Sequence, residues 1–120
     1  MAMRLLLELL LLASDLSGYP VPPALPTVVV VASSEMPCAC RGAHLDGQVW
    51  IDATLDLDRP YGRSVVVHEF THFLQDRAFR NSSIGSAEQS RREAEAIDAQ
   101  NRYLASQGVG QRAATRSRDE

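Results

Sequence analysis

The sequence predicts an α+β fold in which a small, twisted, mostly antiparallel sheet of about three strands packs with three helices. Three observations predict it: a valine run at 27–33, two short extended segments within 42–53, and two long segments with helix start and stop signals at about 59–79 and 86–107. A chain of 120 residues with 45% hydrophobic and 22% charged residues has the size and composition of one ordinary domain. We therefore expect residues 1–108 to form a single domain.

The leucine-rich N-terminal segment predicts a helix at about 2–17, because its leucines recur on one helical face. Arg4 before an apolar run resembles the start of a signal peptide, but Glu8 interrupts that run. The run is also too short to span a bilayer, which needs about 20 apolar residues. We expect a cytoplasmic protein without a membrane span, and the leucine-rich start leaves secretion open as the alternative.

The predicted sheet begins after a proline-rich connection that excludes helix. Thr27 to Ser33 is a β-branched run of the kind found in strands buried on both faces, so we expect it to be a central strand. The dipeptide Asp46-Gly47 suits a tight hairpin turn, because glycine tolerates positive φ. It predicts strands near residues 42–45 and 48–53.

Two helices follow the sheet. Pro60 suits the first turn of a helix at about 59–79, where a missing amide hydrogen costs nothing. The turn residues Asn81, Ser82 and Ser83 separate it from a second helix at about 86–107, which Gly108 ends. The remaining residues 109–120 show no periodicity, and we expect a flexible tail.

The first of these helices carries the string His68-Glu69-Phe70-Thr71-His72. At about 100° per residue the two histidines lie about 40° apart, so both rings can reach one metal ion. Glu69 lies beside them, where it can take a proton from a metal-bound water more easily than it can ligate the metal. The opposite face is apolar, so we expect a dry back and a histidine-lined front; the apolar residues are Val66, Val67, Phe70, Phe73 and Leu74.

A third ligand is needed, because catalytic zinc sites hold the ion with three protein ligands and a water. Glu93 and Glu95 lie 21 and 23 residues beyond His72, on the second helix. Residues two apart on a helix point about 200° apart, and only Glu93 falls on the inward-facing stripe of that helix. We expect Glu93 to be the ligand and Glu95 to be solvated, paired with Arg91 or Arg102.

The stretch "HEFTHFLQ" followed by "REAEAIDAQNRYL" resembles the gluzincins, the metallopeptidase clan typified by thermolysin, and is especially similar to small bacterial minigluzincins. The resemblance covers about Thr27 to Leu104. It implies His68, His72 and Glu93 as ligands of Zn²⁺ and Glu69 as general base and acid. The implied activity is hydrolysis of a peptide or protein substrate by a metal-activated water.

One position departs from the gluzincin pattern. Many members carry an aspartate four residues after the ligand glutamate, where it supports a ligand histidine, and this chain has Ile97 there. The resemblance also implies a strand whose edge binds an extended substrate, for which "GQVWIDATL" is our candidate. Trp50 on it lines a pocket or, as we favour, caps the core. Tyr103 is either an oxyanion partner or, as we favour, a core residue.

The remaining candidates are weaker. Cys38 and Cys40 flank one residue, a spacing that matches no common disulfide framework, and we expect a reduced pair. His44 is expected to be a solvated strand residue; a minor metal site with the two cysteines is disfavoured, since it lacks a fourth ligand. A net charge of −3 gives no electrostatic case for nucleic acid or an anionic membrane.

These patterns favour a soluble zinc-dependent peptidase as the function. Two alternatives stay open: a zinc-binding module that is non-catalytic or latent and binds peptides, and a metal-free helical protein with an accidental motif. The five-residue string fixes only three positions, so it does not separate these readings by itself. Peptide specificity and oligomeric state are not indicated by the sequence.

Overall fold

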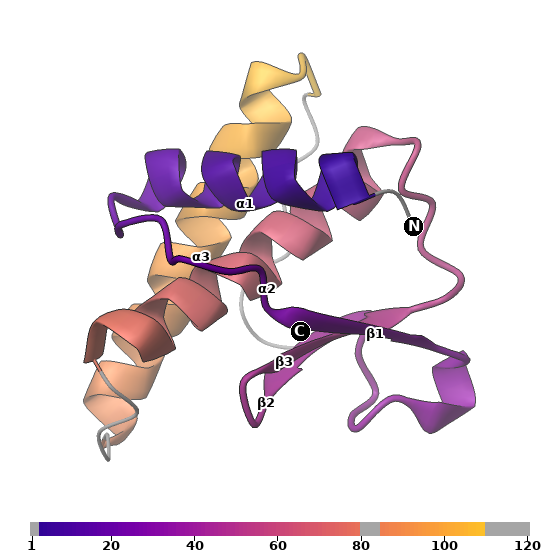
Figure 1. Cartoon of the computed structure of the whole chain (residues 1–120), viewed down its shortest axis with the longest axis horizontal. Coiled ribbons are helices and arrows are strands. Elements are labelled where there is room, and N and C mark those ends of the chain that lie inside the picture. The colour runs from indigo at the N-terminus through magenta and orange to yellow at the C-terminus, as the bar shows by residue number, and fades with distance from the viewer. Residues whose placement is uncertain (1–2, 80–84, 110–120) are drawn as a thin grey trace.

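A computed structural model describes residues 3–79 and 85–109 and has the predicted α+β architecture (Figure 1). The helix and strand ranges agree closely with those expected from the sequence. The turn expected at Asn81, Ser82 and Ser83 and the tail at 110–120 lie outside the described residues. The elements in chain order are α1 (Met3–Ser17), β1 (Thr27–Val31), a short 3-10 helix η1 (Ser33–Glu35), β2 (Gly42–Leu45), β3 (Gln48–Asp52), α2 (Pro60–Phe79) and α3 (Ser86–Ser106).

The sheet is mixed rather than mostly antiparallel as expected, and its strand order is β1-β3-β2. β3 pairs in parallel with β1 and antiparallel with β2, and it is therefore the central strand. The expectation that the valine run is central is wrong: β1 is an edge strand, and Val30 on it is 47% exposed. The β-branched residues predict a strand correctly, but its place in the sheet depends on where the later hairpin inserts, which local sequence does not encode.

The hairpin between β2 and β3 turns where the sequence predicts. Asp46 and Gly47 have φ values of 53° and 75°, the left-handed pair that a two-residue type I′ turn requires. The turn sets the register in which Ala43 faces Trp50 and His44 faces Val49. Because side chains alternate along a strand, Gly42 and His44 point to the same side of the sheet as the buried residues Val49 and Ile51.

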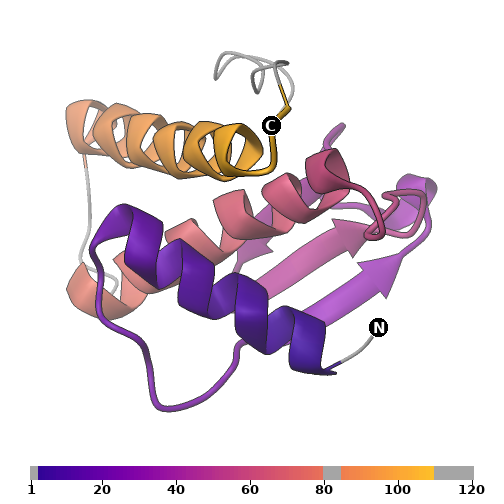
Figure 2. The same ribbon diagram turned by 90° about the horizontal axis from the view of Figure 1, so that it is seen from above.

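The three helices lie on one side of this sheet, with α2 in contact with α1, α3, β2 and β3 (Figure 2). α2 is consequently buried around most of its circumference between its first and last turns. The expected dry back and histidine-lined front are both present, because the apolar residues opposite are buried and His68 and His72 line a cavity. His68 is nevertheless as deeply buried as the apolar residues. The reason is tertiary: α3 covers the polar face that the helix period alone leaves open.

α1 packs across α2 and α3 through one leucine-rich face. Leu6, Leu9, Leu10 and Ala13 are buried in the common core, whereas Leu7 and Leu11 are 45% exposed. Among the residues described, no helix has both the length and the apolar composition needed to cross a bilayer.

Trp50 lies on the opposite side of β3 from the core residues Val49 and Ile51. The ring is only partly buried and belongs neither to the core cluster nor to the lining of the main cavity. The favoured reading from the sequence, a cap on the core, is therefore wrong. Strand alternation assigns Trp50 to the face of the sheet that carries no helices.

Candidate metal centre

The two histidines of α2 project side by side, one turn apart. Their ring centroids are 5.0 Å apart, and the rings meet edge to face. His68 is buried, and the side chain of His72 is 21% exposed, so the pair lies at the boundary between the core and a solvent-accessible cavity. Burial lowers the pKa of His72, but the hydrogen bond to Glu93 and the charge of Glu69 outweigh burial and raise the pKa above its ordinary value.

Glu93 reaches this pair from α3. Its Oε1 lies 2.8 Å from Nε2 of His72, and its Oε2 lies 3.4 Å from Nε2 of His68. One ligand atom from each residue can be chosen so that all three lie within 4.8 Å of one another. His68, His72 and Glu93 could thus hold a metal ion between them. The structure brings together the three residues that the sequence selects as ligands.

Glu95 points away from the histidine pair. Its carboxylate accepts hydrogen bonds from Tyr19 and Gln75 and forms an ion pair with Arg91. The expected partner Arg91 is confirmed, while Arg102 pairs with Asp98 instead. Glu95 is also more than a solvated carboxylate, because it joins α3 to α2 and to the segment that follows α1.

Glu69 is buried beside the histidine pair, at 5% exposure. Burial raises the pKa of its carboxyl, the nearby histidines lower it, and the charge of Glu93 raises it further; the net shift is upward. A carboxyl with a raised pKa can exchange a proton more readily near neutral pH than an exposed glutamate can. Glu69 lies beside the group that could hold a metal without belonging to it.

A cavity of about 650 Å³ opens onto these side chains. One wall comes from β2, another from α2, and a third from the first turns of α3. Beyond the three candidate ligands and Glu69, the lining residues are Cys38, Gly42, Ala43, His44, Gln75, Asp76, Ser86, Gln89, Ser90 and Arg92.

His44 is part of this cavity and is not the solvated strand residue expected from the sequence. Its side chain is 11% exposed, its ring meets Phe73 edge to face, and its Nε2 lies 3.4 Å from Oδ2 of Asp76. Burial lowers the pKa of His44, and the charge of His72 adds to this, while Asp76 opposes both. The sequence could not show this, because burial of His44 arises from the packing of β2 against α2.

Two glutamines that the sequence analysis missed bind the histidine rings at Nδ1, the ring nitrogen that does not face Glu93. Nδ1 of His68 lies 2.9 Å from Oε1 of Gln100, and Nδ1 of His72 lies 2.9 Å from Oε1 of Gln75. Both glutamines are buried. The available signals were Gln75 three residues after His72 on the same helix and Gln100 on the inward stripe of α3, seven residues after Glu93.

Two further expectations concern residues outside this site. Tyr103 is buried at 2% exposure within the core and does not line the cavity, as the favoured core reading predicts. Cys38 and Cys40 are joined by a disulfide, so the expected reduced pair is wrong, and so is any metal site that uses their thiolates. The chain between η1 and β2 turns tightly enough to bring their Cα atoms to 5.2 Å, within the range that a disulfide spans.

Comparison of the chain with protein-family models, with curated proteins and with solved structures finds no match.

Proposed function

We propose that this chain is a zinc-dependent peptidase whose site comprises His68, His72, Glu93 and Glu69. The observation that carries the proposal is the meeting of two imidazole nitrogens and one carboxylate at the wall of a cavity that a second, buried carboxyl also lines. Two histidines and a glutamate are a ligand set used by catalytic zinc, which leaves a fourth position for water.

The histidines also fit zinc in their orientation. Each has Nδ1 engaged by a glutamine oxygen, so that Nε2 faces Glu93 and is available to the ion. When bound, zinc would polarise a peptide carbonyl and lower the pKa of its water toward about 7.

Glu69 would act as the proton carrier of the reaction. Its carboxylate would take the proton of the attacking water and deliver it to the amine that leaves when the peptide bond breaks. The raised pKa supports this role, because it brings the affinity of Glu69 for a proton closer to that of the water it must deprotonate.

β2 is the strand that we propose binds substrate, in place of the β3 region favoured from the sequence. β3 is paired on both edges and cannot accept another strand. Within residues 3–79 and 85–109, β2 has no sheet partner on its second edge, and it contributes Gly42, Ala43 and His44 to the cavity. An extended peptide could add to this edge through backbone hydrogen bonds and so pass in front of Glu69.

One observation favours a second candidate function, a zinc-binding module that holds peptides without cleaving them. Tyr103, the tyrosine considered as an oxyanion partner, lies in the core and outside the cavity. Without it, stabilisation of the oxyanion would depend on the metal and on cavity residues such as His44 and Arg92.

The test compares zinc-loaded wild type with Glu69→Gln on a mixed peptide library, with zinc content measured on both. Loss of Glu69 should reduce cleavage by about 10²–10⁴-fold with zinc retained, because a general base is removed and no ligand is. Asp98→Asn, in an exposed ion pair on α3, is the matched control. Equal cleavage by Glu69→Gln would contradict the mechanism, and peptide binding without cleavage by the wild type would favour the second candidate.

A further inference from the structure

The amide groups of Gln75 and Gln100 have fixed orientations. Nε2 of Gln75 donates to the backbone carbonyl of Arg92 at 2.9 Å and to Oε1 of Glu95 at 3.0 Å, and both partners can only accept. Nε2 of Gln100 donates to Oγ of Ser64, whose own proton goes to the carbonyl of Tyr61. The oxygen of each amide must therefore be the atom that faces a histidine.

This orientation determines the protonation of the two imidazoles. A glutamine oxygen can only accept, so Nδ1 of His68 and Nδ1 of His72 must each carry a hydrogen. Both Nε2 atoms face Glu93, and without a metal Nε2 of His72 also donates a hydrogen to that carboxylate at 2.8 Å. A metal ion would take the place of this hydrogen and leave the one on Nδ1. Two buried amides thus select the tautomer that a metal ion at His68, His72 and Glu93 would need.

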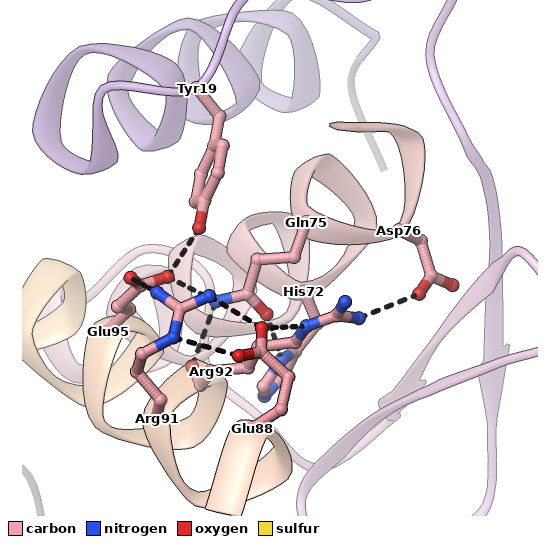
Figure 3. A network of polar contacts seen from close by, with 8 residues as sticks. All are labelled: Tyr19, His72, Gln75, Asp76, Glu88, Arg91, Arg92 and Glu95. Atoms are coloured by element: carbon pink, nitrogen blue, oxygen red, sulfur yellow. Dashed lines mark hydrogen bonds and ion pairs between the residues drawn. The ribbon is translucent and has the colours of Figure 1, made fainter. Parts of the chain in front are cut away.

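The support behind His72 extends further than that behind His68 (Figure 3). Gln75 is held by Glu95, and Glu95 is held in turn by the hydroxyl of Tyr19 and by Arg91. Tyr19 belongs to the segment after α1, so four residues from three parts of the fold form a continuous path to the ring of His72. Burial and the bond to Glu95 both raise the pKa of Tyr19, which keeps it a donor in this path.

We propose that Gln75 and Gln100 are positioning residues for the metal centre, and that Glu95 and Tyr19 hold Gln75 in place. Many gluzincins support a ligand histidine with an aspartate four residues after the ligand glutamate, and this chain has Ile97 there. In our proposal the two glutamines give this support from other positions. The proposal rests on the proposed metal site. A neutral amide fixes the ring as a carboxylate does but adds less to the basicity of the imidazole, so exchanging the amide for a carboxylate strengthens the site.

The chain offers a direct test of that statement. In Gln75→Leu the ring of His72 loses its acceptor. In the exchange variant Gln75→Glu with Glu95→Gln, the carboxylate moves next to His72 and the amide moves to residue 95. Because Tyr19 and Gln75 both donate to Oε1 of Glu95, the Nε2 that takes its place donates to residue 75 and to the Tyr19 hydroxyl, while the amide oxygen accepts from Arg91. The bond to the Arg92 carbonyl is lost, the Tyr19 bond reverses, and the ion pair with Arg91 becomes a contact between a charged and a neutral group.

Zinc affinity is measured by competition with a chromophoric chelator. The tautomer of neutral His72 is measured by ¹⁵N NMR on metal-free protein that also carries Glu93→Ala, which removes the carboxylate that competes for the ring hydrogen. We expect Gln75→Leu to weaken zinc binding by about 10–100-fold and to lose the Nδ1-protonated tautomer. The exchange variant should bind zinc at least as tightly as the wild type. Asp98→Asn should match the wild type in both measurements.

Two results would overturn the positioning role: unchanged zinc affinity in Gln75→Leu, or a neutral His72 that is protonated on Nε2 in metal-free Glu93→Ala with Gln75 intact. If Gln75→Leu fails to fold, the exchange variant remains as the test. Weaker zinc binding by the exchange variant than by the wild type would also overturn the proposal. Absence of zinc binding by the wild type is a different outcome, because it removes the proposed function while the NMR measurement still reports how the glutamines hold the rings.

Discussion

Gly42 in β2 lies directly against Glu69 in α2. A methyl group at Gly42 would come within 3.0 Å of Cγ and 3.2 Å of Oε2 of Glu69, and within 2.8 Å of a methyl carbon of Val65. The separation from Val65 is shorter than side chains tolerate, and those from Glu69 are tight enough to require Glu69 to shift slightly, so the missing side chain at residue 42 is what allows the strand to approach the helix. The contact holds the Glu69 carboxyl between β2 and the histidine pair.

Gly42→Ala should therefore displace Glu69 while leaving the three candidate ligands in place. Peptide cleavage by the zinc-loaded protein should fall, by less than the roughly 100-fold that a displacement of about 1 Å in a reacting group costs. Zinc stoichiometry should not change. Leu45→Ala, at an exposed position of the same strand, is the control. A Gly42→Ala variant with full activity would show that the position of Glu69 does not matter.

Gly62 allows a second close approach, between the first turn of α2 and the loop before it. A methyl group there would lie 2.1 Å from the backbone oxygen of Asp56, an atom that cannot rotate aside. We expect Gly62→Ala to lower the free energy of unfolding by at least about 1–3 kcal/mol, measured by urea denaturation. The control is Ala94→Gly at an exposed position of α3. It measures the difference in helix propensity alone, which favours alanine over glycine by about 1 kcal/mol. Stabilisation by Gly62→Ala would contradict the clash.

Asp52 anchors the end of β3 to the loops around it. Its carboxylate accepts hydrogen bonds from the backbone and hydroxyl of Thr54 and from the hydroxyl of Ser33. The bond from the Thr54 backbone, followed by those from Ser33 and from the Thr54 side chain, lowers the pKa of Asp52. A carboxyl with a lowered folded-state pKa stabilises the fold above its unfolded pKa of about 3.9, and this stabilisation is lost as the pH falls through the folded value.

We therefore expect Asp52→Asn to be less stable than the wild type at neutral pH, with a difference that narrows below about pH 4. Urea denaturation at a series of pH values measures this. Asp98→Asn, whose carboxylate is exposed, is the comparison. A stability difference between Asp52→Asn and the wild type that stays constant from neutral to acid pH would show that the charge of Asp52 is not what stabilises the loop.

Metal binding should also be visible as stability. An ion that binds the folded chain and not the unfolded one stabilises the fold by about 2.7 kcal/mol at a free concentration 100 times its dissociation constant. We expect zinc to raise the melting temperature of the wild type and a chelator to reverse this. His72→Ala should show neither effect. A zinc-induced shift of equal size in His72→Ala would place the ion elsewhere on the chain.

The candidate ligands could be predicted because their arrangement is largely local. The spacing of His68 and His72 fixes their common face on any helix, and the inward stripe of α3 selects Glu93 over Glu95 before its partner helix is known. The type I′ turn at Asp46 and Gly47 is local as well, since it depends on two residues that tolerate positive φ.

The residues around the ligands could not be predicted, because their roles depend on contacts between distant elements. In the sequence, Gln75 is only a polar residue near the end of α2. In the fold, the Arg92 carbonyl and Glu95, both in α3, fix the orientation of its amide. His44 becomes part of the cavity only because β2 packs beside α2. The edge position of β1 likewise follows from the insertion of β3 between β1 and β2.

Zinc stoichiometry by elemental analysis tests the central claim most directly. It is measured at metal saturation on wild type, His72→Ala, Glu93→Gln and Glu95→Gln. We predict one zinc ion per chain in the wild type and in Glu95→Gln, and loss of the ion in His72→Ala and Glu93→Gln. A wild type without zinc, or equal zinc in all four proteins, would contradict a metal centre at His68, His72 and Glu93.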